Sequence, residues 1–186
     1  MLTELDAVNK ILSAAGLAPV ADANSQHPSY RTAKMTLDAV NSDIQSQGAW
    51  YNKSTIVLQP TTDGNVYIPQ TATYCSPVDE ADSALVIRGA RLYDKSTRSY
   101  SIGRSVTVEL IEVLPFNDLP EPARQYIAKR ALYEHFVNKG GQDPKLSEYK
   151  NQLAQALLFY NRENLRNSKP QQNSFQRRAP ASGIRH

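Results

Sequence analysis

Three carboxylates close together in the middle of the chain are its best candidates for catalysis. Asp79, Glu80 and Asp82 lie in one short segment. A glycosidase places two carboxyl groups roughly 5 to 9.5 Å apart around a sugar bond, one as the acid and the other as the base or nucleophile. The segment therefore supports a glycan-hydrolase hypothesis. The simpler interpretation is a solvated acidic loop tip.

Other residues that commonly support catalysis or metal binding are few and scattered. His27, His135 and His186 are not spaced as metal ligands, either with one another or with Cys75. Glu134 precedes a histidine but lacks the second histidine of the zinc-protease motif, and no phosphate-binding loop or serine elbow occurs. Cys75 with a distant histidine is a thiol-nucleophile alternative without a supporting motif. We therefore expect no metal, no cofactor and no enzymatic activity.

The last residues of the chain combine an aromatic ring with positive charge. Phe175 lies between the amide-rich residues 171–173 and the pair Arg177-Arg178. Four of the chain's 21 basic residues come after position 166, where none of its 18 acidic residues lies, so the rest of the chain is close to neutral. A protein that coats nucleic acid more often carries its basic face on the folded part.

This tail allows three interpretations. It is an arm that docks on a neighbouring subunit, with Phe175 as the anchor and Arg177 and Arg178 pairing with carboxylates. Alternatively, it contacts DNA phosphates, or it is only a solvated end. Its composition, rich in Pro, Gln, Asn, Ser and Arg, predicts a flexible basic tail over residues 168–186 in each case.

Helical periodicity characterises both ends of the chain, where apolar residues recur every three or four positions. Thr3 is a candidate N-cap for a first helix, and Pro28 suits the first turn of a second. Pro120 begins a third helix, with Asp118 as its candidate cap, and Pro144 begins a fourth. The four apolar stripes lie within residues 5–15, 30–44, 123–137 and 146–160.

Two apolar features of these helices need a particular place in the fold. Trp50 follows the second helix directly and is expected to plug the edge of the core, because its large ring is costly to expose. Residues 157–160, Leu-Leu-Phe-Tyr, cover more than one face of the fourth helix. They predict either a second contact surface or a helix at the centre of the bundle.

The middle of the chain changes to short β-branched runs. STIVL, NVYI, SALVI and SVTVELIEV lie between residues 54 and 113, and Asp63-Gly64 predicts a turn between the first two. In the last run Val106 and Val108 alternate with polar residues, as in a half-buried strand. Short strands with close turns favour antiparallel pairing. Residues 69–83 fit no pattern and are expected to form a long loop.

The expected fold class is therefore α+β. An antiparallel bundle of about four helices comes from residues 1–50 and 115–167, and an inserted antiparallel β sub-domain comes from residues 51–114. The tail, residues 168–186, extends from the bundle.

Four segments in a fixed order give the chain a family resemblance. They are VNKILSAAGLAPV (residues 8–20), IQSQGAWYN (44–52), LYDKSTRSYSI (92–102) and LPFNDLPEPARQYI (114–127). In this order the chain resembles the tail tubular protein A family, the adaptors of short-tailed, T7-like bacteriophages.

The resemblance implies a structural virion protein. Members form a dodecameric ring between the portal protein and the tail nozzle, tail tubular protein B, and the ring extends the channel through which the genome DNA passes without specific binding. It also implies a place in the virion tail, synthesis in the host bacterial cytoplasm and no membrane partner. The alternatives are the tail-associated glycan hydrolase and a nucleic-acid-binding module that acts through the basic tail.

Overall fold

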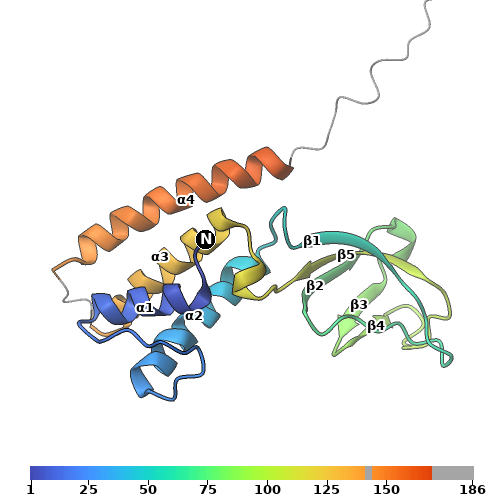
Figure 1. The fold of residues 1–186 in the computed structure, drawn as a ribbon. Coiled ribbons are helices and arrows are strands. Elements are labelled where there is room, and N and C mark those ends of the chain that lie inside the picture. Colours follow the sequence, from blue (N-terminus) through green and yellow to red (C-terminus); the bar gives the residue numbers. More distant parts are fainter. Residues whose placement is uncertain (141–143, 169–186) are drawn as a thin grey trace, which may run out of the picture.

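Helices from the two ends of the chain lie beside a group of strands from its middle (Figure 1). The structure, a computed structural model, describes residues 1–140 and 144–168. Its helices and antiparallel strands confirm the predicted α+β class. The helical bundle contains α1 (Glu4–Ala14), α2 (Pro28–Ser46), α3 (Glu121–Asn138) and α4 (Leu146–Ser168).

The helix starts follow from local hydrogen bonding. Thr3 and Asp6 form a reciprocal capping box, in which each side chain accepts the other residue's backbone N–H. Pro28 is the first residue of α2, as predicted. Asp118 as a cap is wrong: it ends a short 3-10 turn, η2 (Phe116–Asp118), and Pro120 occupies the cap position of α3. The carboxylate of Asp118 therefore comes too early in the chain to cap that helix.

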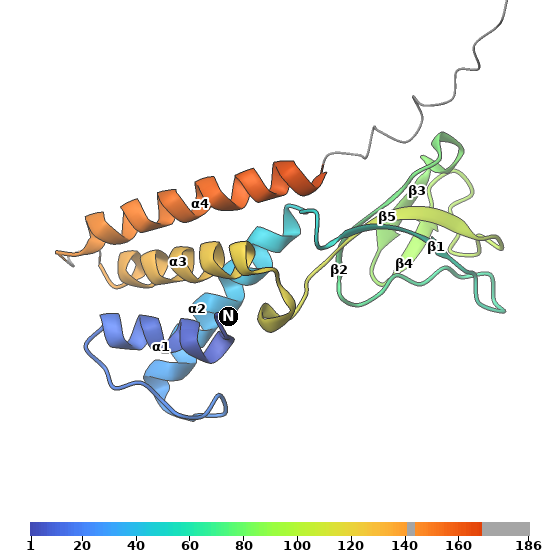
Figure 2. The ribbon, with the colours of Figure 1, turned by 45° about the horizontal axis from the view of Figure 1, so that its top comes forward.

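The bundle is arranged in layers around α3. Helices α1 and α2 pack on one side of α3, and α4 lies along its other side (Figure 2). The core between α1, α2 and α3 is closely packed, because Val8, Ile11, Leu37 and Ile127 are fully buried. Helix α4 is the outermost layer.

The β sub-domain is built around one long strand. Strand β5 (Val106–Glu112) pairs antiparallel with β1 (Lys53–Leu58) on one side and β2 (Ala72–Pro77) on the other. Val106 and Val108 are buried while Thr107 is half-buried, so the predicted alternation is confirmed. A separate hairpin of β3 (Leu85–Arg88) and β4 (Arg91–Asp94) completes the sub-domain.

Two expectations about the middle of the chain are wrong. Residues 69–83 are not one long loop, because they contain β2 and a 3-10 turn, η1 (Glu80–Asp82). The run NVYI is not a regular strand: Val66 is fully buried, but this segment makes only isolated bridges to its neighbours. Strand β2 lies at a sheet edge and has one buried side chain, Cys75, so its pairing with β5 leaves little periodic signal.

Candidate functional site

The three candidate carboxylates lie at η1 but do not share one environment. The side chain of Asp82 is 3% exposed and accepts hydrogen bonds from the guanidinium of Arg104 through both oxygens, which raises the pKa of Arg104. Asp79 and Glu80 are exposed, and within the described residues their side chains make no hydrogen bond or ion pair. Asp82 therefore holds the turn in place, and both of its carboxylate oxygens are occupied by Arg104.

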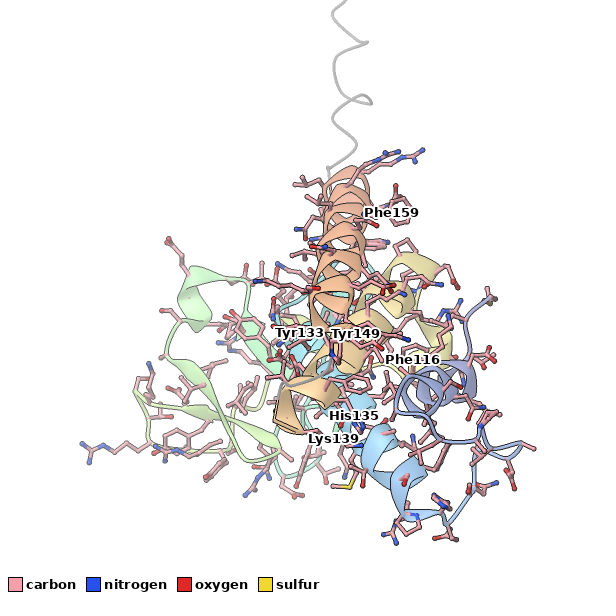
Figure 3. The ribbon with its side chains drawn as sticks, turned by 90° about the vertical axis from the view of Figure 1, so that its left-hand side faces the viewer. Phe116, Tyr133, His135, Lys139, Tyr149 and Phe159 are labelled. Carbon is pink, nitrogen blue, oxygen red and sulfur yellow. The ribbon has the colours of Figure 1, made fainter. Side chains whose placement is uncertain are left out.

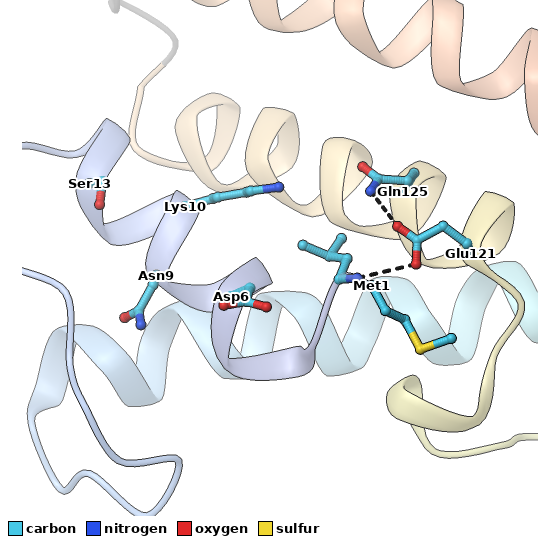
Figure 4. Close-up of a pocket in the computed structure, with 8 residues that line it drawn as sticks. Met1, Asp6, Asn9, Lys10, Ser13, Glu121 and Gln125 are labelled. Carbon is cyan, nitrogen blue, oxygen red and sulfur yellow. Dashed lines mark hydrogen bonds between the residues drawn. The ribbon is translucent and has the colours of Figure 1, made fainter.

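Three hollows on the described surface lie away from these carboxylates. The largest has a volume of about 570 Å³ and lies between the chain start, α1 and α3 (Figure 4). In it the Glu121 carboxylate accepts the Leu2 N–H at 3.2 Å and the Gln125 amide at 2.6 Å. The others lie beside residues 68–73 and 87–90, and beside Trp50 and the end of α4. None of the three is lined by Asp79, Glu80 or Asp82. The first is lined by two other carboxylates, Asp6 and Glu121, and both already accept backbone N–H groups, of Thr3 and Leu2 respectively.

Cys75 and the histidines also lack reactive settings. Burial raises the pKa of Cys75 to about 11, so its thiol stays protonated at neutral pH. Burial, with a smaller effect of Lys139, lowers the pKa of His135, which lies on α3 (Figure 3). His27 caps α2 by accepting the Ser29 N–H. Residues 1–140 and 144–168 contain no group of three or more His, Cys, Asp or Glu that could hold a metal ion.

Trp50 lies at the junction of the bundle and the β sub-domain. It is half-buried and contacts Tyr51 edge-on at 4.9 Å between ring centroids. Tyr160 of α4 lies 5.9 Å from Trp50 and stacks on Tyr126 of α3 at 5.1 Å. The ring thus covers a core edge as part of a four-ring cluster. Sequence analysis missed the three tyrosines because they come from separate segments.

Two buried amides join the points where the chain enters and leaves the β sub-domain. The amide of Gln45, which is fully buried, pairs with both the N–H and the C=O of Leu114, each at 2.9 Å. Asn52 donates to the carbonyls of Gln45 and Glu112 at 2.8 Å and accepts the Ala49 N–H at 2.8 Å. We call Gln45 and Asn52 the amide clamp. It fixes the β sub-domain relative to α2.

Helix α4 presents an apolar surface to solvent. Leu158 is 71% exposed, Leu165 67% and Phe159 49%. Phe159 is labelled on α4 in Figure 3. Only Tyr149 and Tyr160 of this helix are buried, so the alternative of a central helix is wrong. We call Leu158, Phe159 and Leu165 the α4 face. Burying a leucine side chain stabilises an assembly by about 1.5–3 kcal/mol, so this face favours a contact with another protein.

The predicted tail arm belongs to the last residues of the chain. Phe175, Arg177 and Arg178 lie outside the described residues, so their docking role stays a prediction. Among the described residues, no helix combines the length and apolar character that crossing a bilayer would require.

Comparisons with known proteins match nearly the whole chain. A family model described as "Tail tubular protein" matches residues 5–174. Tail tubular protein A of Klebsiella phage KP34 is 30% identical over 170 residues, which are 90% of this chain and 90% of that protein. The family match runs from the first turn of α1 to beyond the end of α4 and includes the strands, the amide clamp and the α4 face, so the similarity covers nearly the whole described fold.

Proposed function

The chain belongs to the tail tubular protein family and is a structural component of a bacteriophage tail, and on this premise we propose that it forms an adaptor ring. The ring is dodecameric, joins the portal to the nozzle protein, tail tubular protein B, and extends the DNA channel. The protein is made in the host bacterial cytoplasm, acts by shape and performs no catalysis. The genome passes without sequence-specific contact.

The α4 face is the observation that carries this proposal. A bundle of this size needs only one apolar side on its outermost helix, and α4 already uses Tyr149 and Tyr160 to pack on α3. The exposed Leu158, Phe159 and Leu165 are therefore in excess of what the isolated chain uses. A ring of identical subunits needs two different patches that meet on neighbours, and the α4 face supplies one such patch.

The amide clamp supports the same function. A heterologous contact closes into a ring only if each subunit holds one fixed angle to the next. Gln45 and Asn52 fasten both chain crossings between bundle and β sub-domain, so the two parts of a subunit keep one orientation. The bundle then provides the ring wall, and the loops of the β sub-domain face a partner, the nozzle.

The tail is the proposed link to the portal or to an adjacent subunit. Phe175 provides an apolar anchor, and Arg177 and Arg178 pair with carboxylates beside it. Deleting residues 168–186 should weaken binding to purified portal rings, measured by biolayer interferometry. Undiminished binding would remove the arm from the proposal.

Electron microscopy of the purified protein mixed with portal rings tests the function as a whole. We expect twelve-fold rings of this protein seated on one end of the portal, and nozzle protein that binds only after the ring has formed. Portal particles that carry no additional ring, at protein concentrations well above those of the portal, would refute the adaptor role.

A further inference from the structure

Arginine and tyrosine side chains gather at the turn of the β3–β4 hairpin. Arg88 and Arg91 are register partners next to this turn. The guanidinium of Arg88 lies 3.8 Å from the ring centroid of Tyr93, and that of Arg91 lies 4.3 Å from Tyr100 and 6.0 Å from Tyr67. Tyr93 and Tyr100 contact each other edge-on at 4.9 Å. We call these five residues the Arg/Tyr surface.

The rings hold the two guanidinium groups without using their hydrogen-bond donors. Within residues 1–140 and 144–168, the side chains of Arg88 and Arg91 make ring contacts but no hydrogen bond or ion pair. Arg88 is exposed and Arg91 is half-buried, and Tyr67, which lies beside Arg91, is 49% exposed. A guanidinium stacked in this way keeps a planar row of N–H groups, which matches a carboxylate or a phosphate.

The charge of the surrounding sub-domain favours carboxylates over a phosphate chain. Residues 53–112 contain six Lys or Arg and seven Asp or Glu, so the sub-domain has no excess of positive charge. Binding a nucleic-acid backbone depends on neutralising several phosphates with a basic face. Two isolated guanidinium groups suit a small number of carboxylates on a protein instead.

The same sub-domain carries two carboxylates that fit this description. Asp79 and Glu80 are exposed and make no hydrogen bond or ion pair among the described residues, and the charge of Asp79 contributes to the raised pKa of Arg104. The Asp82–Arg104 ion pair fixes the turn on which they lie. They precede β3, whereas Arg88 ends it, and the two ends of that strand are roughly 10 Å apart at about 3.3 Å per residue. The two pairs therefore lie towards opposite ends of one hairpin.

We propose that the Arg/Tyr surface of one copy receives Asp79 and Glu80 of the next copy around the ring. The inference rests on the proposed ring and identifies one of its contacts. Two different patches of opposite charge on the same chain are what a heterologous contact between copies requires. Exposed ion pairs add little affinity but set orientation and reject wrong pairings, so this contact fixes the register of subunits.

Charge reversal tests the contact directly. One variant carries Arg88→Glu and Arg91→Glu, a second carries Asp79→Arg and Glu80→Arg, and a third carries all four changes. Assembly of each on portal rings is measured by electron microscopy and by sedimentation. The first two should each assemble at least about tenfold more weakly than the unmodified chain, because like charges then meet.

Rescue distinguishes this contact from general damage. In an equimolar mixture of the first two variants, subunits that alternate around the ring place each reversed patch against an opposite charge. In the third variant both patches are reversed, so every contact between neighbouring copies again joins opposite charges. Both preparations should therefore assemble. Lys95→Glu with Arg98→Glu is the matched control, because it changes the same charge in the same sub-domain outside the Arg/Tyr surface. It should assemble like the unmodified chain. Circular dichroism shows that each variant is folded.

Several outcomes would overturn the proposal. If the Arg88→Glu, Arg91→Glu variant assembles as well as the unmodified chain, the proposed contact is wrong, but the adaptor ring itself remains supported. Folded variants that are not rescued by mixing would assign the surface to another partner. If the Arg88→Glu, Arg91→Glu variant assembles normally but no longer binds a short DNA duplex that the unmodified chain binds, the Arg/Tyr surface contacts nucleic-acid phosphates and not carboxylates. If even the unmodified chain fails to assemble on portal rings, the adaptor function itself fails, and this contact with it.

Discussion

The amide clamp depends on single side chains that satisfy buried backbone groups. Gln45 pairs with the N–H and the C=O of Leu114. Its side chain thus makes the two hydrogen bonds that a neighbouring strand would otherwise make with this residue. Asn52 does the same for three further backbone groups. A buried polar group left without a partner costs about 1–3 kcal/mol. Substitutions at Gln45 and Asn52 should therefore lower the free energy of unfolding more than most single substitutions do.

Replacing Gln45 with leucine should lower the free energy of unfolding by about 2–4 kcal/mol. The change keeps the volume but leaves the Leu114 N–H without a partner, and the Leu114 carbonyl keeps only the longer bond from the Asn41 amide at 3.3 Å. Urea denaturation followed by circular dichroism measures the effect. Gln47→Leu is the control, since Gln47 is exposed at the end of the same helix, and it should change stability by less than about 0.5 kcal/mol. Equal effects of the two changes would refute the clamp.

His135 should make the fold sensitive to mild acid. Burial, then Lys139, depress its pKa in the folded protein below the ordinary value of 6.5. A depressed pKa means that the unfolded chain binds the proton more readily. The stabilisation is therefore complete above pH 6.5 and is lost as the pH falls through the lower folded value. His135→Gln should flatten the decline in stability between pH 7 and 5, measured by urea denaturation. An unchanged slope would show that another group titrates.

Residue types alone predicted part of this chemistry. The capping box at Thr3 and the turn proline at Pro28 depend on neighbours in sequence, so local rules were sufficient. The ion pair that removes Asp82 from the candidate carboxylates depends on Arg104, which lies far along the chain. The spacing of residues carries no information about such a pairing. Sequence analysis therefore treated the three carboxylates as one group, whereas in the fold one is buried and two are exposed.

Among the elements, α4 has the clearest functional consequence. It packs on α3 through a narrow seam that includes Phe136 and Tyr149, whose ring centroids are 5.2 Å apart. Its other side carries the α4 face. The apolar run at residues 157–160 predicted such a surplus, and the structure shows that part of it faces solvent and does not lie in a central core.

Changing Leu158 and Leu165 together to aspartate should block ring assembly without unfolding the chain. Both side chains are already exposed, so the folded subunit loses little, whereas a neighbour would have to bury two charges. We expect a melting temperature within about 2 °C of the unmodified value and no rings on portal particles. Asn24→Asp with Gln26→Glu, at two exposed positions in the loop before α2, is the control, because it adds the same two negative charges away from α4. Normal rings from the leucine variant would exclude the α4 face.

The strands show how far pattern alone predicts an element. Strand β5 alternates buried and half-buried residues along much of its length, so it was predictable. Strand β2 contains one buried residue and is held by β5, and strand β4 contains four residues. Short edge strands owe their conformation to a partner across the sheet, which a local window does not include.

At the scale of the whole molecule, the features that suit the proposed function are exposed patches on the surface and not an enclosed site. The described hollows are open and lie away from Asp79 and Glu80, while the α4 face and the Arg/Tyr surface project outward. The arrangement suits repeated contacts between copies, in agreement with membership in a family of structural tail proteins.

Glu80→Gln should leave the behaviour towards host polysaccharide unchanged. Glu80 is exposed, its carboxylate makes no hydrogen bond or ion pair among the described residues, and it lines none of the three hollows. Reducing-sugar release from capsular polysaccharide should be at background for both the unmodified chain and the variant. Release by the unmodified chain that disappears in Glu80→Gln would establish the hydrolase alternative.

The β sub-domain begins and ends at neighbouring points, because Lys53 and Ile111 face each other across β1 and β5 and the amide clamp closes the gap below them. A segment with adjacent ends behaves as a cassette: it can be exchanged by recombination between viral genomes without breaking the helices on either side. In the proposed ring, exchange of this segment would change the surface that meets the nozzle while the helices of the ring wall keep their packing.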